Sequence, residues 1–338
     1  MSSAIPKAVL YYSPQSVWSS AVLLALSEKG YGEDEVDLKV VDINKGQEFS
    51  PTFLRLSPKA MVPTLIVPLR GSLASDVASR FKAISDTKAL IEFLDKSRSQ
   101  SSHTHTTSSA PAPSLSPATV AFASASSKII DSIHADEVSP DRLQYLNARD
   151  QASLQELGKS LVPILESRRA AIVGYLTDCE QKTLQMSEKT KSFWREKQAE
   201  AETALSVFSG NDVDGYLSRS RIMWEITIPG VLTRLNEEFI GPYALGSSRS
   251  YFVWLMITEH DTGDQVSIVD IHLSAWLSHL VRLAGGSPYD NGDVAIKRVE
   301  KHIGSGGFVF PEDFLPSAFS PFTEEKSSCE EQASSILG

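Results

Sequence analysis

Three segments near the start of the chain carry residues that can bind a small peptide-like ligand. They contain Ser16, the pair Val62 and Pro63, and the pair Asp86 and Thr87. The N–H and C=O groups of Val62 can pair with an extended peptide as neighbouring strands do. If Asp86 and Thr87 begin a helix, its free N–H groups and its dipole favour an anion. A ligand with a peptide-like middle, a carboxylate at one end and an ammonium group nearby matches all three segments.

The sequence around Pro63 allows two interpretations. Proline lacks a backbone N–H and is usually kept out of strand interiors, so Pro63 can simply mark the entrance of the strand Thr64–Val67. Alternatively, a cis bond between Val62 and Pro63 forms a turn that directs the Val62 amide and carbonyl outward.

Alternation, helical periodicity and turn residues predict the elements that must position these residues. We expect the order β-α-β-α-β-β-α within the first 96 residues. The predicted strands are 8–12, 36–41, 64–67 and 81–84, and the predicted helices are 18–29, 51–56 and 88–94. Strand ends and helix N-termini gather at the carboxyl edge of an α/β sheet, so the three segments can meet at one place.

The composition describes an ordinary globular protein with two expected domains. The chain has 338 residues, of which 41% are hydrophobic and 22% charged, and its formal net charge is -10. The acidic balance argues against nucleic acid or an anionic membrane as the main partner. Cys179 and Cys329 are the two cysteines and lack metal-ligand spacing, so no metal site is expected. Without a secretory signal or a run long enough to span a membrane, we expect a cytoplasmic location.

The expected division has four parts. Residues 1–96 form an α/β ligand-binding domain, 97–127 a flexible Ser/Thr/Ala/Pro-rich linker or insertion, 128–325 an all-helical domain and 326–338 a polar tail. His103 and His105 lie in the linker, where a polar tract is favoured over a metal site.

The helical domain is predicted from apolar periodicity and from charge pattern. Residues 184–207 form a charged helix that we expect to be a projecting arm or a lid. Pro229 is expected to kink the helix 218–239. Ser267 and Asp270 form a capping box that favours a structural over a catalytic Asp270. His272, Trp276 and His279 follow on the same helix, where packing is favoured over a metal or base role.

The stretches 11–20 and 25–30 resemble the first strand, loop and helix of glutathione transferases. Residues 46–58 with Met61-Val62-Pro63-Thr64-Leu65 are similar in order and spacing to the zeta class of that superfamily, which includes maleylacetoacetate isomerases. The likeness covers nearly all of residues 8–96 and a shorter stretch around 231–283. It implies a thioredoxin-like N-terminal domain followed by an all-helical domain, in an extended, fungal-like form. It also implies a cis bond before Pro63 and glutathione as the peptide-like ligand.

The resemblance places Ser16 at the position of the family's catalytic serine or cysteine. A serine hydroxyl can donate a hydrogen bond to a thiolate, and the following helix N-terminus adds partial positive charge. Ser13, as a turn residue, and Ser19, as a helix-start residue, compete with Ser16 for this role. Trp18 stands where some relatives carry a cysteine, so a mechanism that needs that thiol is disfavoured.

The remaining ligand contacts are assigned in the same way. Val62 and Pro63 would hold the middle of glutathione, and Asp86 and Thr87 its γ-glutamyl end. Asp86 is one methylene shorter than the family's usual glutamate. Gln47 is either a partner of the glycine carboxylate or a solvated loop residue, and the sequence leaves both open.

The resemblance implies a serine-type glutathione transferase that adds the glutathione thiolate to a small hydrophobic electrophile, as a cytoplasmic homodimer active in detoxification. We expect the electrophile to lie between the domains, against helices within 129–145 and 216–224. Two alternatives remain: a catalytically idle ligand-binding or interaction module of the same fold, and a glutathione-dependent isomerase.

Overall fold

The structure is a computed structural model. The residues that it describes are 7–68, 81–98, 112–116, 120–238, 266–287, 290, 292–304 and 309–310. By internal contacts the chain forms two compact units. The first comprises Met1–Pro113 and Tyr145–Ser220, and the second comprises Ser114–Gln144 and Arg221–Gly338.

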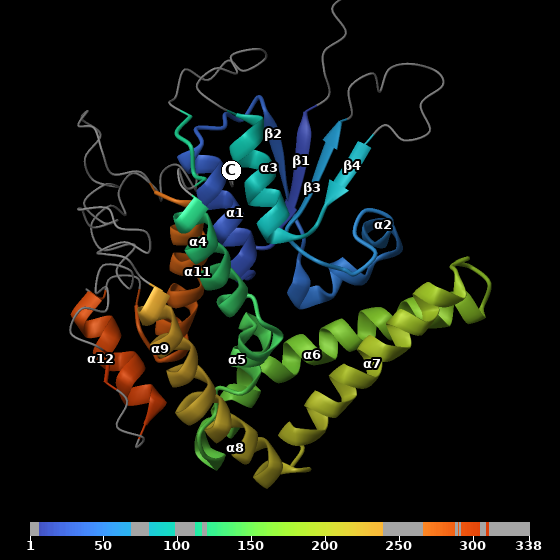
Figure 1. The fold of residues 1–338 in the computed structure, drawn as a ribbon. Coiled ribbons are helices and arrows are strands. Elements are labelled where there is room, and N and C mark those ends of the chain that lie inside the picture. The colour runs from blue at the N-terminus through green and yellow to red at the C-terminus, as the bar shows by residue number, and fades with distance from the viewer. Residues whose placement is uncertain are drawn as a thin grey trace, which may run out of the picture. The chain divides into compact units, whose positions relative to one another are not determined.

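A four-stranded mixed sheet lies at the centre of the first unit, in the order β2-β1-β3-β4 (Figure 1). Its strands are β1 Ala8–Tyr12, β2 Val36–Val40, β3 Thr64–Pro68 and β4 Phe81–Ile84. Strand β1 is parallel to β2 and antiparallel to β3, and β4 is antiparallel to β3. Helix α1, Val17–Glu28, supplies the crossover that the parallel pair β1 and β2 requires.

Successive side chains of each strand point to opposite faces of the sheet, and different helices cover the two faces. Leu10, Leu65 and Ile84 are successive cross-strand partners and all are buried, because this face packs against α1 and α3, Thr87–Ser97. Tyr11 points to the other face, where its ring makes an edge contact at 5.9 Å with Phe53 of the short helix α2, Pro51–Leu54. The sheet and these three helices confirm the predicted thioredoxin-like α/β domain.

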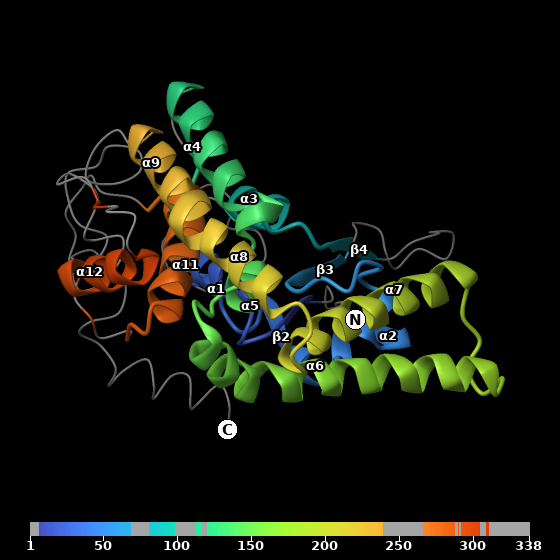
Figure 2. The ribbon, with the colours of Figure 1, turned by 90° about the horizontal axis from the view of Figure 1, so that it is seen from below.

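Two long helices belong to the first unit as well. Helices α6, Gln151–Glu180, and α7, Glu188–Phe208, pack side by side along their lengths (Figures 1 and 2). The helix expected over 184–207 is therefore confirmed. It packs against α6, and the expected role as a projecting arm or a lid stays a prediction. The 3₁₀ turns η1, Ile43–Lys45, and η2, Gln47–Phe49, pack against α6.

The described residues after the sheet are helical, as predicted for an all-α C-terminal region. The remaining helices are α4 Val120–Ile133, η3 Asp136–Val138, α5 Pro140–Tyr145, α8 Val213–Ile222, the π-helix η4 Met223–Thr227, α9 Ile228–Glu238, α11 Ile268–Leu283 and α12 Gly292–Ile303. Within the second unit α11 packs against α4 and α12, and α4 also packs against α9.

The helix expected over 218–239 changes its hydrogen-bond register just before Pro229, and the expected kink stays a prediction. Proline has no N–H to donate to the carbonyl four residues earlier, and a π-helical turn precedes it. In that turn Trp224 is fully buried and its ring meets His302 of α12 edge-on at 4.3 Å.

Helix α11 begins with the predicted capping box and is buried along most of its length. The Ser267 side chain accepts from the Asp270 N–H, and the Asp270 side chain accepts from the Ser267 N–H. His272 and Trp276 are fully buried and His279 is 3% exposed. The expected cap and the expected packing of these residues are therefore both present.

Part of the expected linker is ordered structure. Residues 120–127 lie in α4, and Ala112 and Leu115 are buried. The Lys29 ammonium donates to the Pro113 carbonyl at 2.6 Å and pairs with the buried Asp95 at 2.9 Å. The four-part division itself stays a prediction, and His103, His105 and Cys329 lie outside the described residues.

Candidate ligand site at the sheet edge

Strand register explains why the three predicted segments come together. Tyr11 of β1 is paired with Thr64 of β3, and Leu65 is paired with Ile84 of β4. Because β3 is antiparallel to both neighbours, its N-terminal end lies beside the C-terminal ends of β1 and β4. The loops that follow β1 and β4 and the loop that precedes β3 therefore leave the sheet at the same edge.

Ser16 is the N-cap of α1, and its hydroxyl has two neighbours. The oxygen accepts from the Ser19 N–H at 3.2 Å, and the hydroxyl points to the Val62 carbonyl at 3.5 Å. The second distance is beyond the usual 2.5–3.0 Å of an O–H···O bond. Helix α1 has no acidic residue in its first turn. The Ser16 proton is thus only weakly held and can be donated to an anion at this helix N-terminus.

In the loop before β3, Val62 differs from its neighbours in its backbone hydrogen bonds. The N–H of Ala60 donates to the Ser57 carbonyl, and the N–H of Met61 donates to the Ser57 hydroxyl. Pro63 has no N–H. Among the described residues the Val62 N–H has no acceptor, while its carbonyl faces Ser16. The peptide bond between Val62 and Pro63 is cis, which confirms that expectation.

Ser57, Thr64 and Ser85 hold the loop before β3, and the sequence-based interpretation missed them. The Thr64 hydroxyl lies 2.7 Å from the Met61 carbonyl and 3.0 Å from the Ser85 hydroxyl. Ser57 is fully buried and its hydroxyl also donates to the Met61 carbonyl at 3.2 Å. The only signal in the sequence was their position beside the recognised motif, since serine and threonine are common in every loop.

Asp86 and Thr87 begin α3 as predicted. Asp86 is the exposed N-cap, and one of its carboxylate oxygens accepts from the Ala89 N–H at 2.8 Å. Thr87, at the first helical position, is 6% exposed. Ser85, which Thr64 joins to the loop before β3, is the residue directly before Asp86. The loop before β3 therefore faces Ser16 and is linked by hydrogen bonds through Thr64 and Ser85 to the start of α3.

Gln47 is not joined to this group by any hydrogen bond among the described residues. Its side-chain oxygen accepts from the Asp42 N–H at 2.9 Å, and the residue is exposed. This contact closes the turn that begins at Asp42. The contact is structural, and it leaves the Gln47 side-chain NH₂ group available as a donor.

The competing serines have structural contacts of their own. Ser13 and Ser19 are both fully buried, and the Ser13 N–H donates to the Ser19 hydroxyl at 3.2 Å. The Ser13 carbonyl accepts from the Ser16 N–H at 3.0 Å, which makes Ser13 the turn residue that was expected. Ser19 was the candidate for the start of the helix. The N-cap of α1 is Ser16 instead, so Ser19 is the third residue of the helix.

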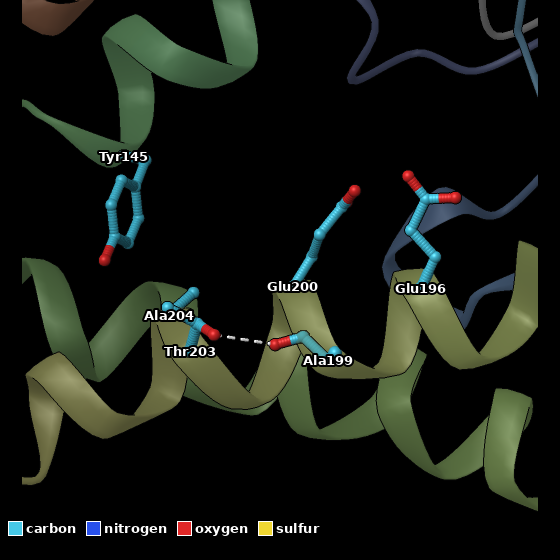
Figure 3. A pocket seen from close by; sticks show the side chains of 6 residues that line it. All are labelled: Tyr145, Glu196, Ala199, Glu200, Thr203 and Ala204. Carbon is cyan, nitrogen blue, oxygen red and sulfur yellow. Dashed lines mark hydrogen bonds between the residues drawn. The ribbon is translucent and has the colours of Figure 1, made fainter.

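A separate pocket of about 640 Å³ lies on the helical part of the first unit (Figure 3). Its lining residues are Tyr145, Glu196, Ala199, Glu200, Thr203 and Ala204. The Tyr145 ring faces the space across from the two glutamates of α7 (Figure 3), and burial raises the pKa of Tyr145 above its ordinary value. None of the predicted site residues lines this pocket.

The described ranges contain neither a cluster of potential metal ligands nor a helix that could cross a membrane. No three His, Cys, Asp or Glu residues there lie close enough together to hold a metal ion. No helix in the part of the chain that the structure describes is both long and apolar enough to cross a membrane.

Comparison with known proteins places the N-terminal domain in a class. Residues 10–102 match the family model "Glutathione S-transferase, N-terminal domain". The chain therefore carries an N-terminal domain of the glutathione S-transferase type, joined to a largely helical region as in that architecture. Curated protein sequences give no significant match.

Several solved structures resemble the chain over most of its length. A glutathione transferase homolog from Sulfitobacter with bound glutathione has 14% identity and a TM-score of 0.42, covering 98% of this chain and 99% of that one. A beta-etherase from Sphingobium has 15% identity and a TM-score of 0.49, covering 98% and 100%. A maleylacetoacetate isomerase from Methylobacterium extorquens with bound malonate and glutathione has 15% identity and a TM-score of 0.41, covering 92% and 96%. At these values the resemblances support no functional argument.

Proposed function

We propose that the protein is a serine-type glutathione transferase that binds glutathione along Val62 and activates its thiol with Ser16. The observation that carries this proposal is the pairing of a weakly held Ser16 hydroxyl with the Val62 backbone, whose N–H is free among the described residues. Both lie within residues 10–102, which match the glutathione S-transferase N-terminal model.

The residues present fit a peptide-like thiol. Val62 offers one N–H and one C=O, the pair of groups that an extended peptide uses in strand pairing. The start of α3 offers the Thr87 N–H, one of the donors that a helix leaves unpaired at its N-terminus. The second oxygen of the exposed Asp86 carboxylate is suited to the γ-glutamyl ammonium. Pro63 is buried and shapes the loop.

Ser16 lowers the pKa of the bound thiol. When bound, glutathione supplies the nucleophilic sulfur. A free thiol has a pKa of about 8.5, so each unit by which the site lowers it contributes roughly 1.4 kcal/mol. A serine hydroxyl does not take up the proton at neutral pH. It donates its own proton to the thiolate while its oxygen continues to accept from the Ser19 N–H, and the N-terminus of α1 adds partial positive charge.

We also propose that the co-substrate is a small hydrophobic electrophile and that the protein is a cytoplasmic homodimer active in detoxification. The resemblance to the superfamily supports these proposals. Gln47 stays in the proposal as a donor to the glycine carboxylate, through its side-chain NH₂ group.

A catalytically idle module of the same fold is the second candidate. The helices α6 and α7 favour it, because they add a large charged surface to the N-terminal domain that the Ser16 chemistry does not require. The glutathione-dependent isomerase remains as a variant of the first proposal, in which the thiol adds to a double bond and leaves again.

Calorimetric titration with glutathione, followed by rate measurements on an electrophile panel and on maleylacetone, separates these functions. We expect glutathione binding and conjugation of a chlorodinitrobenzene-type substrate. Binding without turnover of any substrate supports the idle module. Turnover of maleylacetone alone supports the isomerase, and failure to bind glutathione overturns the proposed function.

A further inference from the structure

We propose that the α6–α7 hairpin braces the segment between β2 and β3, and that Trp194 on this hairpin is a positioning residue that sets the affinity for glutathione. The inference rests on the proposed function. It concerns the turns η1 and η2, which carry Gln47 between two flanking anchor points.

Trp194 makes the central contact. It is fully buried, and its indole N–H donates to the Phe49 carbonyl at 3.0 Å. The indole also stacks on Tyr175 of α6, with ring centroids 5.3 Å apart and an interplanar angle of 26°. The donor is therefore fixed in direction by packing against both helices of the hairpin, and it reaches the backbone of the segment rather than a side chain.

The Phe49 side chain is enclosed by the same hairpin. It is 4% exposed and belongs to a buried cluster with Leu54, Ile172 and Trp194. The Arg168 guanidinium lies 5.2 Å from the centre of the Phe49 ring. This apolar cluster is distinct from the core between the sheet and α1, and it joins the turn η2 to α6 and α7.

Two further anchors directly flank Gln47, Glu48 after it and Gly46 before it. Glu48 has a side chain that is 3% exposed and pairs with Arg168 at 3.0 Å. Gly46 has a φ of +68°, and a Cβ there would lie 3.1 Å from the Ala171 Cβ and 3.2 Å from the Arg168 Cα. The backbone of the turn therefore approaches α6 closely, which requires glycine.

These contacts leave Gln47 as the exposed residue between buried neighbours. Gly46, Glu48 and Phe49 are buried against the hairpin, while Gln47 is exposed and caps the Asp42 N–H. The hairpin thus determines where the Gln47 side chain stands. Ser16 is not hydrogen-bonded to the turns η1 and η2 among the described residues, so loosening these two turns should weaken glutathione binding and leave thiol activation unchanged.

The test compares two tryptophans with the same chemistry. Trp276 in α11 is also fully buried and also donates its indole N–H to a backbone carbonyl, that of Val138 at 3.1 Å. Trp194→Phe and Trp276→Phe each keep an aromatic ring and remove one such donor. We expect W194F to raise the KM for glutathione about three- to tenfold at unchanged kcat, the factor typical of one lost hydrogen bond. We expect W276F to leave both constants unchanged.

Amide hydrogen exchange provides a second measurement that does not depend on glutathione. The N–H groups of Gly46, Gln47 and Phe49 all donate within the two turns, and W194F should speed their exchange while W276F should not. Three results would each contradict the proposal that the hairpin braces the segment. They are a KM for glutathione in W194F equal to that of wild type, an equal rise of this KM in W276F, and amide exchange in W194F that is no faster than in W276F. If wild-type protein binds no glutathione, the proposed function falls together with the assigned role in affinity, and the exchange comparison alone decides whether the hairpin braces the segment.

Discussion

Ser16 and Ser267 each cap a helix, α1 and α11 respectively, and each accepts a hydrogen bond from the N–H three residues later. In α11 that residue is Asp270, whose carboxylate accepts both the N–H and the hydroxyl proton of Ser267. In α1 it is Ser19, whose hydroxyl accepts from Ser13 instead. The Ser267 proton is therefore fully used by its own helix, whereas the Ser16 proton faces the Val62 carbonyl only at 3.5 Å.

The same two helices also carry buried titratable groups whose pKa values move in opposite directions. Burial raises the pKa of Glu28 in α1 to about 7, and burial together with the nearby Arg282 lowers the pKa of His279 in α11 to about 4. Arg282 can only donate, so it donates to His279 Nδ1 at 2.9 Å, and Nε2–H then donates to the Pro140 carbonyl at 3.1 Å. Burial favours the neutral form in both cases, which is protonated for glutamate and deprotonated for histidine.

Residue type and helix position alone therefore do not determine the functional role of a capping serine. A capping serine is structural where a carboxylate takes its proton, and it is available to a ligand where none does. The contrast between α1 and α11 should appear in the activity, the stability and the pH dependence of variants in the two helices.

The largest effect is expected from Ser16→Ala. Loss of the hydroxyl should lower kcat/KM for conjugation about 10- to 100-fold, because a hydrogen bond to a charged group contributes roughly 1.5–3 kcal/mol. The pH–rate profile should shift upward by about one unit or more, since the thiolate loses a donor. Ser16→Thr, which keeps the hydroxyl, should restore most of the rate. Ser19→Ala is the control for the neighbouring serine, and full activity of S16A would remove Ser16 from the mechanism.

Glu28→Gln should stabilise the protein at neutral pH. Because the folded pKa is about 7 and the unfolded reference is 4.5, the folded state keeps a proton that the unfolded state loses as the pH rises through this window. The free energy of unfolding of the wild type therefore falls between pH 4.5 and 7 relative to E28Q. We expect a gain for E28Q on the order of 2 kcal/mol above pH 7. Glu33→Gln, at an exposed glutamate, is the control, and an equal gain there would contradict the assignment to burial.

His279 should give the opposite pH dependence. Its folded pKa of about 4 lies below the unfolded value of 6.5, so its contribution to stability is present above pH 6.5 and is lost as the pH falls toward 4. Urea unfolding of wild type and His279→Gln should show a steeper acid loss in the wild type, by up to about 1.4 kcal/mol per pH unit. The contribution of Glu28 is common to both proteins and cancels. Parallel pH curves would show that His279 does not titrate in this range.

Ser267→Ala should have the smallest effect and a purely structural one. Loss of the cap should lower the free energy of unfolding by about 1 kcal/mol, measured by chemical denaturation. Glutathione turnover should stay unchanged at temperatures where the protein is folded, in contrast to S16A. A loss of turnover as large as that of S16A would erase the distinction between the two caps.

Much of the fold was predictable because its signals are local. The apolar run Ala8–Tyr12, the periodicity of α1 and the proline before β3 each encode a strand, a helix or a turn within a few residues. The Ser267–Asp270 box was predictable for the same reason, since both partners lie within one helical turn. The packing of α7 was not predicted, because charge pattern reveals an exposed face of a helix but not the apolar contacts of Trp194 with Phe49.

The sequence alone predicts the order of the elements and the caps that begin α3 and α11, and it limits the loop at Pro63 to two forms, a plain strand entrance or a cis turn. These depend on backbone conformation and on hydrogen bonds between near neighbours. Three other features depend on tertiary structure. They are the approach of the Ser16 hydroxyl to the Val62 carbonyl, the hydrogen bond by which Thr64 joins this loop to the start of α3, and the packing of the α6–α7 hairpin on the turn around Gln47. Such contacts join residues 21 to 145 positions apart, and they exist only once the register of the strands and the packing of the helices bring those residues within hydrogen-bond distance.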